Sequence, residues 1–338
     1  MRETPGIAAA VDVLVTGGTG LVGNNVIRML LEAGRTVRAI VRGRTGLQGK
    51  AVEGLAIERA AGDVTDADAV RRAVAGAEMV VHSAAMVHVG WRNLEAMRRV
   101  NVEGTRLVAD ACRREGARLV HVSSVDALGI PDGGGPGDEE TPPGGMVDCP
   151  YVVTKREAER AVLDEVGRGL DAVIVNPVYM LGPWDWKPSS GRMLLEVAAG
   201  RGLFAPPGSN DFADVRDVAA GILSAMTLGV TGRRYILGGH PLSYGDAWKI
   251  FAEATGRRPP LRDAPPRIVK VAGRFGDLLA AITGREGPVN SAATGMSMLR
   301  HNFRFDRART ELNYTVRPIE RTVADTWDWF LANGYAKR

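Results

Sequence analysis

Tyr151 and Lys155 lie four residues apart and could perform acid–base chemistry together. On a helix this spacing places both side chains on one face, so an ammonium group can lie beside a phenol. A free tyrosine has a pKa of about 10, and a fixed cation nearby favours the phenolate. An ordinary exposed helix pair has the same spacing. The interpretation of the pair therefore depends on the rest of the chain.

A glycine-rich run lies far upstream of this pair and reads Thr16-Gly17-Gly18-Thr19-Gly20-Leu21-Val22-Gly23. It follows the apolar residues 11–15 and precedes residues 24–31, which have helical periodicity. In this order Gly17 permits a tight turn, Gly20 lets a pyrophosphate approach the backbone, and Gly23 lets the helix pack on the strand. The N–H groups at the helix start would then meet the phosphate charge. A glycine turn that binds nothing is the alternative, but the flanking strand and helix favour a nucleotide site.

Length and composition are those of a soluble enzyme. A chain of 338 residues predicts about two domains. The net charge is only +4, with 43 basic and 39 acidic residues interspersed, so we expect no nucleic-acid partner. Cys112 and Cys149 lack metal-ligand spacing, so we expect no metal and a reducing, cytoplasmic location. Residues 1–10 are expected to be a loose leader rather than a signal peptide, and no apolar run could span a membrane, so no membrane partner is expected.

Strands and helices alternate through the first half of the chain, which predicts an α/β fold with a doubly wound parallel sheet. We expect strands at 11–15, 37–41, 55–58, 79–82, 119–122 and 172–175, and helices near 66–75, 92–115 and 151–168. After Pro177 the alternation fails, returns briefly in 211–238, and gives way to mainly helical sequence. The expected domains are a nucleotide-binding domain, 11–178 plus about 211–238, and a smaller substrate-binding cap, 179–210 plus 239–338.

In this order the motifs resemble those of an extended, or atypical, short-chain dehydrogenase/reductase of the NAD-dependent epimerase/dehydratase superfamily. Within it, the chain is most similar to the dihydroflavonol-4-reductase-like and 3β-hydroxysteroid dehydrogenase-like branch, from Val11 to about Gly334. Besides the glycine run, the matching motifs are Gly62-Asp63, Ser83-Ala84-Ala85, Asn101-Val102-Glu103-Gly104-Thr105, Ser123-Ser124, Tyr151 to Lys155, and Asn176-Pro177-Val178. The resemblance implies a Rossmann-type domain and a homodimer formed through helices 92–115 and 151–168.

The resemblance also assigns catalytic roles. Tyr151 would donate a proton to a carbonyl oxygen as hydride arrives, or remove it from an alcohol in reverse. Lys155 would hold the nicotinamide ribose hydroxyls and lower the pKa of Tyr151. Ser124 would hydrogen-bond the reacting oxygen, because it lies five residues before Gly129 as in the family's pattern, and Ser123 is the fallback.

The end of the second strand bears on the choice of cofactor. An acidic residue there would bind the ribose of NAD, whereas Arg42-Gly43-Arg44 follows this strand and favours the 2′-phosphate of NADP. NAD remains possible, because Arg42 could be an ordinary surface arginine; Arg38 points to the opposite face of its strand. The expected cofactor contacts are Gly17, Gly18, Thr19, Gly20, Leu21, Val22, Gly23, Arg42, Asp63, Val64, Ala84, Ala85, Asn101, Lys155, Pro177 and Val178.

Substrate contacts are expected in the loops after the strands nearest the cofactor. The candidates are Met86, His88, Trp91, Asp126, Tyr179, Met180 and Trp184. Their Met and Trp content favours an apolar or aromatic substrate, although packing between domains explains each aromatic residue equally well. Asp214 and Asp217 are interpreted as structural.

Three functions fit these residues. The leading one is an NADP-preferring reductase or dehydrogenase acting on a ketone or secondary alcohol of a hydrophobic small molecule. The second is a nucleotide-sugar epimerase or dehydratase with retained NAD; Arg42 and the lack of an obvious basic cluster in 179–213 argue against it. The third is a non-catalytic NADP-binding redox sensor, which the presence of both Tyr151 and Lys155 disfavours.

Overall fold

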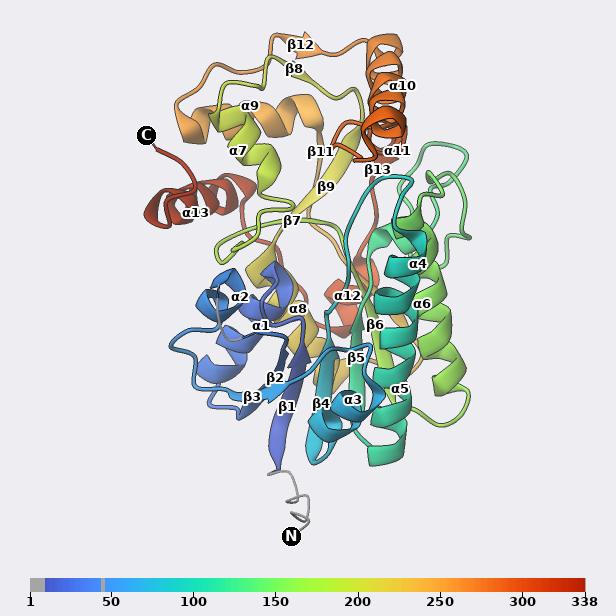
Figure 1. Ribbon diagram of the computed structural model, residues 1–338. Coiled ribbons are helices and arrows are strands. Elements are labelled where there is room, and N and C mark those ends of the chain that lie inside the picture. Colours follow the sequence, from blue (N-terminus) through green and yellow to red (C-terminus); the bar gives the residue numbers. More distant parts are fainter. Residues whose placement is uncertain (1–9, 44–45, 338) are drawn as a thin grey trace.

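The computed structural model describes residues 10–43 and 46–337 (Figure 1). Arg44 and almost all of the predicted leader, 1–10, lie outside the described residues. Figure 1 shows a sheet covered by helices on both faces, with a second group of elements above the carboxyl ends of the strands. This arrangement confirms the predicted α/β fold with a doubly wound sheet.

The central sheet has seven parallel strands in the order β10-β6-β5-β4-β1-β2-β3. These are β1 (Val11–Thr16), β2 (Val37–Val41), β3 (Glu58–Ala61), β4 (Ala77–His82), β5 (Arg118–Val122), β6 (Ala172–Pro177) and β10 (Arg234–Leu237). Valine-rich runs form the inner strands because both faces of a parallel sheet are buried. The chain reverses its direction of travel across the sheet between β1 and β4, and ligands bind at such a switch point.

Helices cover both faces of this sheet. They are α1 (Leu21–Glu32), α2 (Gly46–Ala51), α3 (Ala67–Val74), α4 (Leu94–Met97), α5 (Gly104–Glu115), α6 (Pro150–Val166) and α8 (Val215–Leu228). Helices α1 and α8 pack beside each other on one face, and α3, α5 and α6 cover the other. A π-helical segment, η1 (Arg98–Glu103), joins α4 to α5 without a break. A 3₁₀ turn, η2 (Val125–Ala127), follows β5.

The cap contains a second sheet as well as helices. Its strands are β7 (Tyr179–Leu181), β8 (Phe204–Ala205), β9 (Ser209–Asp214), β11 (His240–Ser243), β12 (Arg262–Asp263) and β13 (Arg300–His301). Its helices are α7 (Arg192–Ala198), α9 (Tyr244–Thr255), α10 (Pro266–Thr283), α11 (Ser291–Met296) and α13 (Ile319–Ala332), with α12 (Asp306–Glu311) below them. Strands β7, β11 and β13 all pair with β9, and β8 pairs with β12.

Two details of the fold differ from the expectations. The third strand is β3, Glu58–Ala61, rather than 55–58, because this edge strand is largely exposed and lacks the apolar run that marks the inner strands. The segment from Phe303 to Tyr314, which the sequence assigned to the cap, packs into the apolar core on the α1 and α8 face. The chain therefore returns to the sheet once more before α13.

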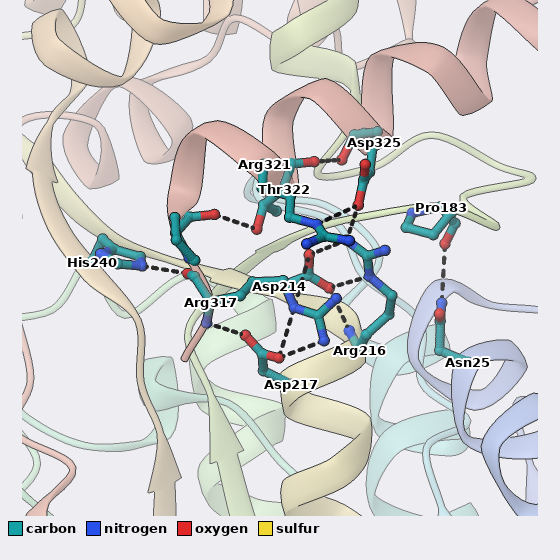
Figure 2. Close-up of polar contacts among 12 residues, drawn as sticks. Asn25, Pro183, Asp214, Arg216, Asp217, His240, Arg317, Arg321, Thr322 and Asp325 are labelled. Atoms are coloured by element: carbon teal, nitrogen blue, oxygen red, sulfur yellow. Dashed lines mark hydrogen bonds and ion pairs between the residues drawn. The ribbon is translucent and has the colours of Figure 1, made fainter. Parts of the chain in front are cut away.

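An ion-pair network joins the cap to the sheet domain (Figure 2). Asp214 binds Arg216 at 2.7 Å, and Asp217 binds Arg317 at 2.7 Å. Arg216 also reaches Asp325 on α13, at 2.7 Å. Such partly buried networks fix the relative position of the elements that they join. Asp214 and Asp217 therefore have the structural role that their position in the sequence indicated.

Candidate active site

The glycine turn between β1 and α1 is shaped to admit a bound group. Gly17 has φ +72°, and a Cβ atom there would meet Ala84 N at 2.7 Å. A Cβ atom on Gly23 would lie 2.4 Å from Gly17 O, so the helix can pack this closely only with glycine. A Cβ atom on Gly20, in contrast, would have only Gly17 O within 4 Å, at 3.4 Å, and would face open space.

The start of α1 has unsatisfied polar groups that suit a phosphate. Its N-cap residue, Gly20, provides no side-chain hydrogen bond, and the described first turn carries no acidic residue. The first N–H groups of a helix without a side-chain cap attract anions. The turn thus fits the pyrophosphate of a dinucleotide. The neighbouring predicted contacts Gly18, Thr19, Leu21 and Val22 belong to this same turn and helix start.

Arg42 and Arg38 occupy different environments. Arg42 follows β2, its side chain is 62% exposed, and it lies 3.6 Å from Asp63. Arg38 is buried; it donates to Glu58 and to the carbonyl oxygens of Ala73 and Ala75. Arg42 is therefore exposed to a ligand at the end of β2, whereas Arg38 holds β2, β3 and α3 together.

The catalytic candidates meet at the carboxyl end of β5. Tyr151 and Lys155 lie on the first two turns of α6, which begins at Pro150, a residue that favours the first helical position. The Lys155 Nζ donates to Val122 O at 3.1 Å and to Ser123 O at 3.3 Å. Ser124 lies near the Tyr151 phenol, and its hydroxyl donates to Asp126 Oδ2 at 3.0 Å. The structure thus brings together the three residues that the motifs indicated.

The electrostatics of Tyr151 differ from the expectation. Burial raises the pKa of Tyr151, Asp126 raises it further, and the nearby Ser124 hydroxyl opposes both. Lys155 was expected to lower the pKa of Tyr151, and this lowering is not seen. The Lys155 ammonium group is directed instead to the carbonyl oxygens of Val122 and Ser123, at the end of β5. Burial lowers the pKa of Lys155 to about 8, against the opposing effects of Glu159 and Asp126. Tyr151 is therefore held in its protonated form.

Asp126 links Ser124 to the cap. Its Oδ2 accepts a hydrogen bond from the Ser124 hydroxyl at 3.0 Å, and its N–H donates to the same hydroxyl at 3.2 Å. Its Oδ1 lies 3.7 Å from His301 Nε2, on β13 of the cap. His301 is 3% exposed, and its Nε2 is also 3.1 Å from the sulfur of Met146. Sequence reasoning missed His301 because it lies far along the chain in a strand of two residues.

The buried carboxylate of Glu159 acts on Lys155 through its negative charge. Glu159, one turn further along α6, accepts hydrogen bonds from Asn176 at 2.6 Å and from Arg234 at 2.6 Å. Asn176 also donates to Ser124 O at 2.9 Å, which ties β6 to the segment after β5. Glu159 is 2% exposed, so its charge acts on Lys155 with little screening by water.

His82 lies near Lys155 but is not suited to acid–base work. Its Nδ1 and Nε2 lie 2.7 Å and 3.0 Å from the hydroxyls of Thr16 and Thr105. Burial lowers the pKa of His82 to about 3, and the nearby Lys155 adds to the effect. His82 is therefore neutral at physiological pH and serves to hold β1, β4 and α5 together.

Asn101 positions a loop beside the site. It lies in η1, and its side chain accepts from Met86 N at 2.7 Å and donates to Met86 O at 3.0 Å and to Thr154 Oγ1 at 3.1 Å. Met86 in turn packs against the cluster that contains Tyr151. The remaining predicted cofactor residues, Asp63, Val64, Ala84, Ala85, Pro177 and Val178, lie at or just beyond the carboxyl ends of β3, β4 and β6.

Two predicted substrate residues contact the cap instead of the catalytic centre. His88 Nε2 lies 2.5 Å from Glu286 Oε2. The backbone N–H of Trp91 donates to Glu286 at 2.8 Å, and its indole N–H donates to Ser291 at 2.7 Å. Trp91 is also 48% exposed. Glu286, which sequence reasoning did not single out, thus fixes the loop after β4 to the segment between α10 and α11.

The aromatic residues after β6 pack within the cap. The Tyr179 hydroxyl donates to Ser190 O at 2.5 Å, and its ring meets Phe212 edge to face. The Trp184 ring lies 3.3 Å from the guanidinium carbon of Arg28 on α1, so it links the cap to the nucleotide-binding domain. Met180 packs against the sheet core.

Known proteins share both the sequence and the fold. Residues 13–238 match the NAD dependent epimerase/dehydratase family. The chain is 36% identical to sterol demethylase protein B of Methylococcus capsulatus, over 95% of this chain and 98% of that protein. It is 34% identical to a Synechocystis protein named "Putative dihydroflavonol 4-reductase", over 98% of each. The crystal structure of gox2253 matches with a TM-score of 0.81 and 33% identity, over 96% of this chain and 99% of that one.

The family match covers residues 13–238, the similarity to the relatives extends over nearly the whole chain, and the seven-stranded parallel sheet agrees with both. The chain therefore belongs to the NAD-dependent epimerase/dehydratase family, among the extended short-chain dehydrogenases/reductases, and is an NAD(P)-dependent enzyme that acts on a CH–OH or C=O group.

Proposed function

We propose that this enzyme uses NADPH to reduce a ketone of a hydrophobic small molecule, or runs the reverse oxidation of a secondary alcohol. The observation that carries the proposal is the cluster of Ser124, Tyr151 and Lys155 at the carboxyl end of β5. Bound NADPH would supply the hydride. The turn at Gly17, Gly20 and Gly23 would hold its pyrophosphate.

Tyr151 would act as the proton donor to the carbonyl oxygen. Burial and Asp126 both favour the protonated phenol, which is the form needed for reduction. The Ser124 hydroxyl, close to the same phenol, would hydrogen-bond the oxygen as negative charge develops there. Lys155 would hold the ribose of the cofactor, and its charge would stabilise the phenolate that forms. These electrostatics favour the reductive direction.

NADPH is proposed over NADH because of Arg42. Its guanidinium group is exposed at the end of β2, and no acidic residue directly follows this strand in the sequence. A guanidinium group pairs with a phosphate through two parallel hydrogen bonds, which the hydroxyl of NADH cannot offer. Asp63, 3.6 Å from Arg42, would lie beside the adenine as the resemblance implies.

An apolar substrate is proposed from the residues around Tyr151. The side chains that pack with Tyr151 are mainly apolar, among them Met86, Val89, Met146, Val147 and Met296. Ligand pockets combine such surfaces with a few placed polar groups, and Asp126 and His301 would be those groups here. Two relatives are named for a sterol and a dihydroflavonol reaction, and both kinds of molecule have fused rings. We therefore propose a polycyclic ketone or alcohol.

Replacing Tyr151 by Phe tests the proposed mechanism. Removing the phenol oxygen takes away the proton donor but leaves the ring in its apolar cluster, so we expect kcat to fall by about 10²–10⁴-fold. Titration with NADPH should give an unchanged Kd. A Tyr151→Phe enzyme that turns over at the wild-type rate would overturn the mechanism.

A further inference from the structure

Helix α10 carries an apolar stripe on its outer side. Its six large apolar residues that point outward are 50–75% exposed, and they are Ile268, Val271, Phe275, Leu278, Leu279 and Ile282. At 3.6 residues per turn these positions fall within about 100° of arc. A stripe of this width normally faces a core. On α10, the helix at the upper right of Figure 1, the stripe is exposed instead.

The opposite side of α10 is already occupied. Gly273 and Ala280 are buried on this inner side, and α10 packs there on α11. A Cβ atom on Gly273 would lie 2.1 Å from Thr294 Oγ1, and one on Gly276 would lie 1.9 Å from Val289 O. The small residues thus attach the helix to the protein. The large apolar ones are left for another surface.

Basic side chains border one edge of the stripe. Arg267, Lys270 and Arg274 are exposed, and no salt bridge or hydrogen bond engages their side chains within the described residues. The acidic residue of the helix, Asp277, accepts a hydrogen bond from Ser291 N and so faces inward. An apolar stripe with cations along one edge complements an anionic lipid surface, where acyl chains lie beneath negative headgroups.

Other exposed apolar residues lie on segments near the two ends of α10. Leu261, Leu203 and Phe204 are 75%, 55% and 47% exposed, and they lie together because Leu261 N donates to Leu203 O at 3.0 Å just before α10 begins. At the other end, the exposed Trp91 is tied to Ser291 by its indole N–H. Exposed apolar patches mark sites of association. Tryptophan is also typical of the membrane–water interface.

We propose that the outer face of α10 binds the surface of an anionic lipid bilayer, with the helix lying in the plane of the interface. The sequence predicted no membrane partner, and the exposed stripe is the reason to revise that prediction. No helix in the described parts of the chain is long and apolar enough to cross a membrane, so α10 would lie on it. The proposal is independent of the reaction that the enzyme catalyses.

Flotation of the full-length protein with vesicles tests the proposal. We expect the wild type to float with phosphatidylglycerol-containing vesicles, and the triple variant Val271→Ser, Phe275→Ser, Ile282→Ser to lose at least about tenfold in partitioning. The matched control, Leu47→Ser, Leu228→Ser, Val230→Ser, removes exposed apolar side chains elsewhere and should float as the wild type does. Circular dichroism and NADPH binding would confirm that each variant is folded.

A second variant tests the charges. Replacing Arg267, Lys270 and Arg274 by Gln should weaken binding to phosphatidylglycerol vesicles and reduce its salt dependence, while leaving the weaker binding to phosphatidylcholine unchanged. Light scattering would be recorded in parallel. A wild type that does not float, or a stripe variant that floats equally well, would overturn the proposal. So would a stripe variant that converts a non-floating dimer to a monomer, because the stripe would then bind a second copy of the chain.

Discussion

The glycine turn and the candidate catalytic centre lie at the same edge of the sheet but are assembled differently. The turn is built by one continuous segment, from β1 through Gly23 into α1. The catalytic centre combines η2, α6 and β13, and the Asp126–His301 contact joins residues far apart in the sequence. The turn is thus specified by local backbone geometry, whereas the catalytic centre depends on how the cap sits on the sheet.

This difference predicts separable effects of mutation. Changes in the turn should alter cofactor affinity and leave the chemical step intact. Changes in the catalytic centre should slow the chemical step and leave cofactor affinity intact. Each of the following variants is paired with a control from the same region, so that loss of folding can be told apart from loss of function.

After Tyr151→Phe, the largest effect is expected from Ser124→Ala. Removing the hydroxyl that would stabilise charge on the reacting oxygen should lower kcat about 10²-fold, with an unchanged Kd for NADPH. Ser123→Ala is the control, because the buried Ser123 hydroxyl has no hydrogen-bond partner among the described residues. Steady-state kinetics would compare the two. A loss of rate confined to Ser123→Ala would move the catalytic role to Ser123.

Gly20→Ala should weaken cofactor binding without harming the fold. The added methyl group would lie in the space that faces the expected pyrophosphate, so we expect the Kd for NADPH to rise by about tenfold, equivalent to about 1.4 kcal/mol. Gly23→Ala would instead force a Cβ atom to 2.4 Å from Gly17 O and should also lower the free energy of unfolding, by about 1–3 kcal/mol. Cofactor titration and denaturant unfolding measure these effects. A Gly20→Ala enzyme that binds NADPH normally would contradict the assignment.

Arg42→Gln should change cofactor preference by a smaller amount. Loss of a charge-assisted contact to the 2′-phosphate should raise the Kd for NADPH several-fold to about tenfold and leave that for NADH unchanged. Arg38→Gln removes bonds to Glu58, Ala73 O and Ala75 O, so it should destabilise the fold without altering the preference. Equal losses for both cofactors in Arg42→Gln would remove the argument for NADPH.

The smallest effect is a shift in pH dependence. The pKa of Lys155 is about 8, so its positive charge is present below that pH and lost above it, and the rate should decline above about pH 8. Glu159 raises this pKa, so Glu159→Gln should move the decline to lower pH. Glu157→Gln, on the same helix but paired with Arg98 near the surface, should leave the profile unchanged. The measurement is kcat/KM against pH, and an unshifted profile in Glu159→Gln would exclude a role for Lys155 in the basic limb.

The sequence was sufficient where structure is local. The strand, glycine turn and helix around Gly17, Gly20 and Gly23 follow from periodicity and from the conformational freedom of glycine. Tyr151 and Lys155 could be placed on one face from the sequence because both lie on a single helix. The order of the parallel strands then brought Ser124 to the same edge of the sheet.

The sequence was insufficient where distant segments meet. Nothing near His301 or Glu286 indicates that these side chains contact Asp126 and His88. The direction of the Tyr151 pKa shift also depends on the tertiary structure, because burial and Asp126 outweigh any influence of Lys155. The sequence also did not indicate that the apolar side of α10 is exposed, because its pattern is that of a helix that faces a core.

We propose that Tyr151 donates a proton in a reaction that consumes NADPH. The most direct test follows NADPH absorbance and product formation together, with sterol and flavonoid ketones and with nucleotide sugars as substrates. The proposal predicts one NADPH oxidised per alcohol formed from a polycyclic ketone, and loss of both signals in Tyr151→Phe. Conversion of a nucleotide sugar without net oxidation of NADPH would contradict it and identify the enzyme as an epimerase or dehydratase.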